Sequence, residues 1–221
     1  MKNLKIYILL FLVFVLTNNN FSQERSFSIT AGYGLNKPVS DLQSQGSGSG
    51  GMGFYFNPVN ALDVGITFNM GTFNGKQNNY VYDTVTGVKF LNNFFDYGIK
   101  AIYNLYSLID PNPYAKFALS ISAGIGLMDF RSRIEDLNGN YLHGFGYENA
   151  QTAKKKPTTE LLAPFSLGFK YRFNKNYSLA LEPTFIWCNT DKLDDVINGK
   201  KDFYFYFPLI FEYKLYVKPL K

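Results

Sequence analysis

Residues 115–127 read AKFALSISAGIGL, with an apolar residue at every odd position and a small or charged residue at every even one. Because successive residues of a β-strand point to opposite faces, this period of two predicts a strand with one apolar face and one small, polar face. The pattern recurs in eight segments of the chain: 26–35, 50–57, 61–73, 89–105, 113–129, 160–173, 176–189 and 202–217. The sequence therefore predicts an all-β domain, and an even number of strands near eight is typical of the smallest barrels that cross membranes.

The predicted connections alternate in length along the chain. Those at 57–61, 106–112 and 174–175 are short and rich in Asn and Pro, whereas those at 36–49, 74–88, 130–159 and 190–201 are long and polar. Transmembrane barrels have short turns at one end and long loops at the other. The alternation therefore predicts an eight-stranded antiparallel up-and-down transmembrane β-barrel with both termini at the short-turn end.

The N-terminus has the order of a secretory signal peptide. Lys2 and Lys5 precede an apolar run at 6–16, which is followed by polar residues and the small Ser22. The run is too short to span a bilayer as a helix, so we expect a signal peptide at 1–23, export by a Sec-type route, cleavage near residues 22–23 and a barrel domain at 24–221. No later segment has about 18 consecutive apolar residues, so a membrane-embedded domain would have to cross with strands.

Side-chain volume indicates which face of the strands points inward. One face carries bulky aromatic residues, and the other carries mostly Gly, Ser and Thr. An eight-stranded lumen has little room, so we expect the bulky face to point outward into lipid. The outward set is Phe54, Phe56, Phe68, Phe95, Tyr97, Phe117, Phe165, Phe169, Phe185, Trp187, Phe205 and Phe211. A soluble barrel or sandwich shows the same alternation and stays open as an alternative.

Three prolines fall inside predicted strands, at Pro164, Pro183 and Pro208. Proline has no N–H to donate to the sheet, so each predicts a bulge or a locally broken pair.

The inward positions also collect a nearly balanced set of charges, which suits a lumen in which buried charges are paired. This predicted lumenal ionic network consists of Asp63, Asp96, Lys100, Lys116, Lys170, Arg172, Glu182, Glu212 and Lys214.

A tight turn at 174–176 would place Glu182 diagonal to Lys170 on neighbouring strands. Glu182, Lys170 and Glu212 are then expected to form a ladder across the lumen at mid-height, with Asp96 and Lys100 opposite. Such a ladder could line a selectivity path for ions or small solutes, or it could close the lumen. A barrel this narrow favours closure.

The predicted loop at 130–159 holds the only histidine of the chain, His143. An outer-membrane lipid-modifying enzyme needs a Ser, a His and an acid fixed on the barrel wall. His143 lies in the turn-rich stretch NGNYLHG with no serine beside it, which favours a solvated loop histidine and no catalytic residue. Because the chain has one His and one Cys (Cys188), we expect no disulfide, metal site or cofactor.

The same loop is the best candidate for an interaction surface. Its basic residues are Arg131, Arg133, His143, Lys154, Lys155 and Lys156. The formal net charge is only +5, and 154–156 is the one basic cluster, so nucleic acid is not an expected partner.

Several stretches resemble the PorT-like outer-membrane β-barrel proteins: FSQ at 21–23, FSITAGYG at 27–34 and YRFNKNYSLALEPTF at 171–185. The short turn followed by Leu-Glu-Pro is the most specific piece, and the resemblance covers the mature chain. It implies an eight-stranded barrel in the outer membrane of a Gram-negative cell, inserted by the barrel-assembly machinery. It implies little chemistry, although PorT itself is associated with protein secretion. The chain departs from many such barrels in ending YVKPLK rather than on an aromatic residue.

Three functions follow as hypotheses. The first is a barrel without catalysis, with a structural or interaction role through long extracellular loops. The second is a narrow porin-like channel, and the third is a lipid-modifying enzyme. The expected partners are outer-membrane lipid and lipopolysaccharide, the barrel-assembly machinery and an unidentified protein at the loops.

Overall fold

The computed structural model describes residues 25–40, 42–59, 61–108, 112, 115–147, 156–197 and 199–217. The predicted signal peptide at 1–23, and Lys154 and Lys155, lie outside the described residues. The strands are β1 Ser26–Val39, β2 Ser44–Gln45, β3 Ser47–Val59, β4 Leu62–Tyr82, β5 Val85–Asn104, β6 Phe117–Asp136, β7 Tyr141–Phe145, β8 Thr158–Arg172, β9 Tyr177–Leu181, β10 Thr184–Cys188 and β11 Phe203–Tyr216, and a short 3-10 helix, η1 Leu105–Leu108, follows β5. In this part of the chain no helix is long and apolar enough to cross a membrane.

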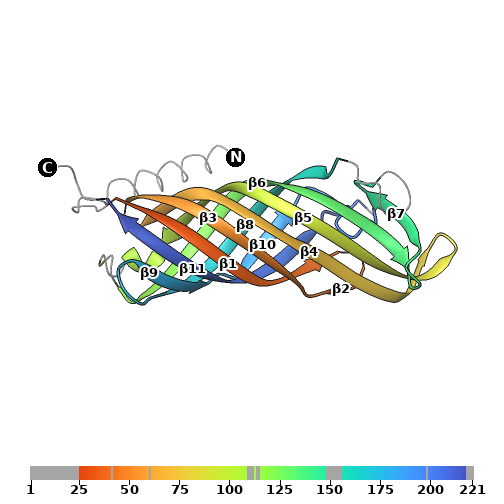
Figure 1. Cartoon of the computed structure of the whole chain (residues 1–221), viewed down its shortest axis with the longest axis horizontal. Helices are drawn as coiled ribbons and strands as arrows, with labels where there is room; N and C mark the ends of the chain where they lie inside the picture. The colour runs from red at the N-terminus through yellow and green to blue at the C-terminus, as the bar shows by residue number, and fades with distance from the viewer. Residues whose placement is uncertain are drawn as a thin grey trace, which may run out of the picture.

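The strands close into one antiparallel barrel (Figure 1). β1 pairs with β3 along one edge and with β11 along the other, from Ser26 opposite Tyr216 to Val39 opposite Phe203. β9 and β10 each pair with both β8 and β11, so together they occupy one position in the ring. The ring therefore has eight positions, and the predicted eight-stranded antiparallel barrel is confirmed. β1 begins and β11 ends at one end of the barrel, the turn end; the opposite end is the loop end.

The segment 74–88, expected to be a loop, is instead a long hairpin. β4 and β5 stay paired from Leu62 opposite Tyr103 to Tyr82 opposite Val85, with a register shift between Gln77 and Val81. The turn places Asp83 at φ 54°, which Asp tolerates better than most residues. The sequence did not predict this extension, because residues 74–88 are mostly polar and do not alternate with apolar residues.

The expected loop at 130–159 is also partly sheet. β6 continues to Asp136, and β7 turns back to pair with it, placing His143 opposite Ile134. His143 therefore lies on a strand, and the expectation of a solvated loop histidine was wrong about its setting.

The three prolines mark interruptions, as predicted. The β6–β8 pairing skips the residues around Pro164 and resumes in the same register. Pro183 separates β9 from β10, and Pro208 lies across from this break, where its carbonyl oxygen accepts the Glu182 N–H at 3.2 Å. Unchanged register on both sides means broken pairs rather than bulges.

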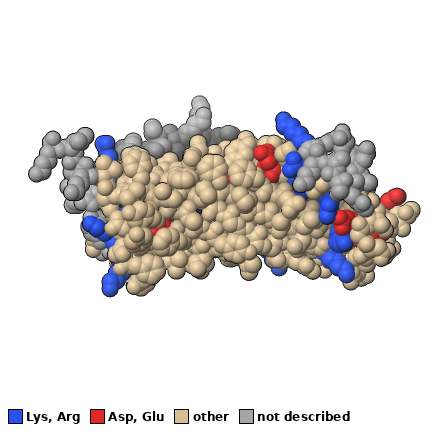
Figure 2. Space-filling model, viewed as in Figure 1, with Lys and Arg blue, Asp and Glu red and all other residues tan. Residues whose placement is uncertain are grey.

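The outer wall near the turn end and middle of the barrel is apolar. All the predicted outward aromatics point away from the interior or lie at least partly exposed. Exposed apolar residues there include Phe27, Ile29, Met52, Phe54, Ile66, Ile99, Phe117, Ile121, Ile125, Phe165, Phe169, Leu209 and Phe211. In Figure 2, Lys and Arg gather at the two ends and leave the broad middle of this face without them. Such a band between charged ends is that of a barrel that spans a membrane.

The two faces exchange character toward the loop end. On β6 the outward residues change from Ile125 and Leu127 to Arg131 and Arg133. The inward residues there are mostly apolar, namely Met128, Phe130 and Ile134. An apolar core fills this half of the interior: Leu42, Phe73, Val88, Phe90, Phe94, Met128, Phe130, Ile134, Leu162, Ile186, Cys188, Leu193, Tyr204 and Tyr206. The volume argument was therefore wrong for the loop end, where the lumen does admit bulky side chains. Apolar groups face lipid where lipid surrounds the wall, and face inward where water does.

Candidate functional site

The polar half of the interior holds a group of paired charges close to the turn end. Lys170 Nζ lies 2.7 Å from Glu212 Oε2, and Lys214 Nζ lies 3.7 Å from Asp63 Oδ1 and 4.0 Å from Glu212 Oε1. The Ser178 hydroxyl donates to Glu212 at 2.5 Å. Glu212 and Ser178 are buried. Each carboxylate here therefore has a cation or a hydroxyl against it, which the low polarity of the interior demands.

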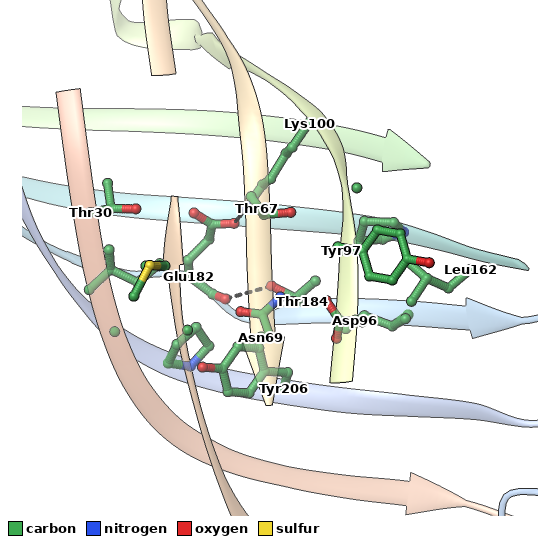
Figure 3. A pocket seen from close by; sticks show the side chains of 18 of the residues that line it. Thr30, Thr67, Asn69, Asp96, Tyr97, Lys100, Leu162, Glu182, Thr184 and Tyr206 are labelled. Carbon is green, nitrogen blue, oxygen red and sulfur yellow. Dashed lines mark hydrogen bonds and ion pairs between the residues drawn. The ribbon is translucent and has the colours of Figure 1, made fainter. Parts of the chain in front are cut away.

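A second ion pair lies at mid-height. Lys100 contacts Glu182, which also accepts a hydrogen bond from the Ser166 hydroxyl at 2.6 Å. The pair borders a cavity of about 70 Å³ (Figure 3), around which Figure 3 also shows Asn69, Thr184 and Tyr206. A further cavity, of about 30 Å³, lies between this pair and the Lys170–Glu212 group. Spaces of this size hold a few water molecules.

The charges of the expected ladder form separate groups, and their partners differ from those predicted from the sequence. Glu182 does face Gly168, but it pairs with Lys100 rather than with Lys170. Asp96 accepts hydrogen bonds from Asn69 at 2.7 Å and from the Tyr204 hydroxyl at 3.3 Å. The register of neighbouring strands was derived correctly, whereas contacts across the lumen depend on the barrel's closure.

Two residues of the predicted network lie at the turn-end rim. Arg172 donates to the Ala115 carbonyl oxygen at 2.6 Å, and its own backbone N–H donates to the Lys116 carbonyl oxygen at 2.8 Å. These contacts hold the start of β6 against the end of β8. The structure therefore gives Arg172 a backbone partner in place of the predicted lumenal one.

The interior of the loop end also contains residues 190–197, which we call the lid segment. It lies between β10 and β11 and turns inward, so that Leu193 is fully buried within the apolar core. The Asn92 side chain donates to the Leu193 carbonyl oxygen at 2.8 Å. The Leu42 N–H donates to Asp194 Oδ2 at 2.8 Å, and the Ser132 hydroxyl lies 2.9 Å from the Lys192 carbonyl oxygen. Three different parts of the wall thus hold the lid segment down.

Asp195 joins the lid segment to β7. Its Oδ2 lies 2.9 Å from His143 Nδ1, and its Oδ1 lies 3.3 Å from the Ser132 hydroxyl. The Asp195 side chain is fully buried, whereas that of His143 is 46% exposed. Desolvation raises the pKa of Asp195 to about 6, against the lowering effect of His143, Ser132 and the Phe145 N–H. Neither Asp195 nor Ser132 was singled out from the sequence, because only the fold brings them to His143.

This group has the residue types of a nucleophilic triad in a different order. Catalysis needs the imidazole between the serine and the acid. Here the carboxylate of Asp195 lies between Ser132 and His143, and Ser132 is fully buried. The arrangement fixes the imidazole but does not activate the serine. Among the described residues, no group of three His, Cys, Asp or Glu side chains could hold a metal ion.

The predicted interaction surface lies partly on the outer wall of the loop end. Arg133 Nε lies 2.9 Å from Glu135 Oε1, and Lys89 Nζ lies 3.2 Å from Glu135 Oε2. Arg131 follows the same outward face, with its side chain against Gly146, and Lys156 is exposed. A second acid, Asp129, lies two residues before Arg131 on the same outward face and accepts from the Thr159 hydroxyl at 2.5 Å. The cations of this region, Lys89, Arg131, Arg133 and Lys156, outnumber these two acids.

No family model matches the chain, and no curated protein matches it. A major outer membrane protein from Thermus thermophilus is 11% identical, with a TM-score of 0.54 over 86% of this chain and 99% of that chain. Neisserial surface protein A is 16% identical (TM-score 0.47, 86% and 97% covered), and Ail of Yersinia pestis, in complex with a heparin analogue, is 12% identical (0.47, 87% and 99%). The chain therefore shares the fold of the Thermus protein, at an identity that carries no activity across.

Proposed function

We propose that this chain is a small integral protein of the outer membrane of a Gram-negative cell, with no catalysis and a structural or interaction role. Its loop end faces the outside of the cell, and the barrel-assembly machinery inserts it after export and signal cleavage. The apolar wall supports the membrane location, and the resemblance to PorT-like barrels supports the choice of membrane. Transmembrane barrels carry their long loops outside, which supports the orientation.

A filled interior carries the proposal. Paired charges occupy the half near the turn end, and aromatic and aliphatic side chains occupy the other half. The lid segment adds to this filling, because Leu193 is fully buried within the apolar core of the loop end. With its inside used for packing, the molecule offers partners mainly its outer surface.

Conductance across a planar lipid bilayer tests this closure. The wild-type protein and Glu182→Gln are both expected to stay at the baseline of the bare bilayer, and Glu182→Gln to unfold at a lower temperature because Lys100 loses its partner. Glu135→Gln, on the outer wall, is the matched control and should leave both readings unchanged. Steady single-channel currents whose ion selectivity changes in Glu182→Gln would establish the alternative, a narrow pore through the cavity beside Glu182.

A lipid-modifying enzyme is a second alternative. One observation favours it: the buried Asp195 carboxylate holds the His143 imidazole in place at the loop end. We expect cells carrying His143→Ala to have lipid A identical to that of wild-type cells by mass spectrometry. Loss of a lipid A modification in the cells that carry this variant would show that the protein is an enzyme.

For the partner we propose anionic lipopolysaccharide, held by Arg131, Arg133 and Lys156 at the level of its phosphate groups. Basic residues near an anionic membrane surface contribute about 1 kcal/mol each. Reversing both charges in Arg131→Glu/Arg133→Glu is therefore expected to weaken binding of fluorescent lipopolysaccharide to the detergent-solubilised barrel by about tenfold or more.

The control makes the same change at the opposite end, in Lys116→Glu/Lys175→Glu. It should bind lipopolysaccharide as the wild type does. Equal weakening in both variants would show a nonspecific effect of net charge, and no weakening in the first would remove lipopolysaccharide as the partner at this surface.

A further inference from the structure

The lid segment is held by contacts of two kinds. Leu193 packs into the apolar core and its carbonyl oxygen accepts from the Asn92 side chain, while its N–H donates to the Asp202 carboxylate at 2.9 Å. The contact between Asp195 and His143 joins two titratable side chains across separate elements, the lid segment and β7.

The backbone shows that Asp195 is placed under constraint. Its φ of 69° lies in the left-handed region, which few residues other than Gly, Asn and Asp adopt without cost. Its side chain is fully buried against Ser132 and the imidazole. Opening the lid segment would release this conformation and expose the carboxyl to water.

We propose that the lid segment is an acid-tightened latch, which takes up a proton at the Asp195–His143 contact and closes more firmly over the extracellular mouth as the pH falls. The proposal concerns the movement of this segment and does not depend on which partner binds the outer wall.

The direction follows from proton linkage. Burial raises the pKa of Asp195 to about 6 in the closed lid, whereas an aspartate in water has a pKa of about 3.9. Between these values the closed form binds a proton that the open form does not. The bound proton therefore stabilises the closed form relative to the open form, fully below about pH 4. This stabilisation is lost as the pH rises through about 6.

Other titratable groups lie around the lid segment, and one of them is Asp202, whose carboxylate accepts the Leu193 N–H at 2.9 Å. Tyr82 on β4 and Tyr141 on β7 both lie within reach of the charge of Asp195, and burial, followed by that charge, raises the pKa of both phenols. They therefore stay neutral between pH 4 and 8. Lys192 and Asp194 belong to the lid segment itself; Lys192 lies 3.7 Å from Glu160 on β8, and Asp194 accepts from Leu42. His143 and Asp195 lie in direct contact, so the proton taken up on closing belongs to the pair rather than to either side chain alone.

Hydrogen exchange of peptides covering 190–197, corrected for the intrinsic exchange rate at each pH, measures the opening equilibrium. For the wild-type barrel in detergent micelles we expect the open fraction to fall about tenfold or more from pH 7.5 to pH 5, since each unit of pKa shift is worth a factor of ten. Asp195→Asn keeps a side chain that tolerates positive φ and cannot titrate. Its open fraction should change less than twofold over this range.

Two further variants complete the test. His143→Gln removes the imidazole that lowers the pKa of Asp195, so its pH dependence should persist with a midpoint above that of the wild type. Asp136→Asn, a control at an exposed carboxyl whose pKa is lowered mainly by hydrogen bonds from its own turn, should respond to pH as the wild type does. An open fraction in the wild type that is constant or rises on acidification overturns the latch. A pH response that survives in Asp195→Asn does so too.

Discussion

Replacement of Phe73 by Ala is expected to lower the free energy of unfolding by about 3–5 kcal/mol. Phe73 is fully buried in the interior of the loop end, with its ring centroid 4.5 Å from that of Phe94 and 4.9 Å from that of Tyr204. Truncation leaves a cavity between these rings, because the surrounding strands are fixed by their pairing. Urea titration of the barrel in phospholipid vesicles, followed by the fluorescence of Trp187, the only tryptophan, measures the change.

Phe169→Ala is the matched control, since Phe169 is 51% exposed on the outer wall. Lipid fills the space that its ring leaves, so only the transfer free energy of the removed atoms is lost, about 1.5–3 kcal/mol. A cost for Phe73→Ala no larger than that for Phe169→Ala would contradict the packed interior at the loop end, and with it the exchange of faces along the barrel.

Replacement of Glu212 by Ala is expected to lower the free energy of unfolding by about 3–5 kcal/mol. The change leaves Lys170 inside the barrel without the carboxylate that lies 2.7 Å from it, and removes one of the two acids beside Lys214. The same titration in vesicles measures the loss. The double variant Lys170→Met/Glu212→Gln removes both charges at similar volume and should recover most of the stability, while Lys214 keeps Asp63.

An outer-wall carboxylate with similar partners serves as the comparison. Glu135 lies against Lys89 and Arg133, and the Lys89 side chain is 40% exposed. Water screens these charges, so Glu135→Ala should cost about 1 kcal/mol or less. If Glu212→Ala costs no more than Glu135→Ala, or if the double variant is as unstable as the single one, the interior charges are not a paired network.

Much of the barrel could be predicted from local patterns. The alternation at 115–127 predicted a strand there. The short turn at 174–176 predicted the register of the two strands that it joins, β8 and β9, and the Phe173 N–H does donate to the Tyr177 carbonyl oxygen at 3.0 Å. The prolines were placed at broken pairs for the same local reason, the missing N–H. Strand ends at the loop end were missed, because polar hairpins such as 74–88 carry no alternation of apolar residues.

Contacts across the lumen could not be predicted in this way. Lys100 and Glu182 are 82 residues apart in sequence, and Ser132 and Asp195 are 63 apart. The alternation of inward and outward positions identified which charged residues face the lumen but not which of them pair. Pairs across the lumen depend on how the strands are staggered when the barrel closes. The latch is therefore absent from any sequence pattern and present only in the fold.

The sequence by itself determined that residues alternate between two faces, and hence that the chain forms strands of a small barrel. The tertiary structure decided which face of each strand lies outward at each level of the barrel. Near the turn end the apolar face lies outward and the charges pair within; near the loop end Phe73 and Phe130 lie inside and Arg131 and Arg133 outside. The physical reason is that the hydrophobic effect sorts side chains by what surrounds the wall, and only the assembled barrel fixes where lipid gives way to water.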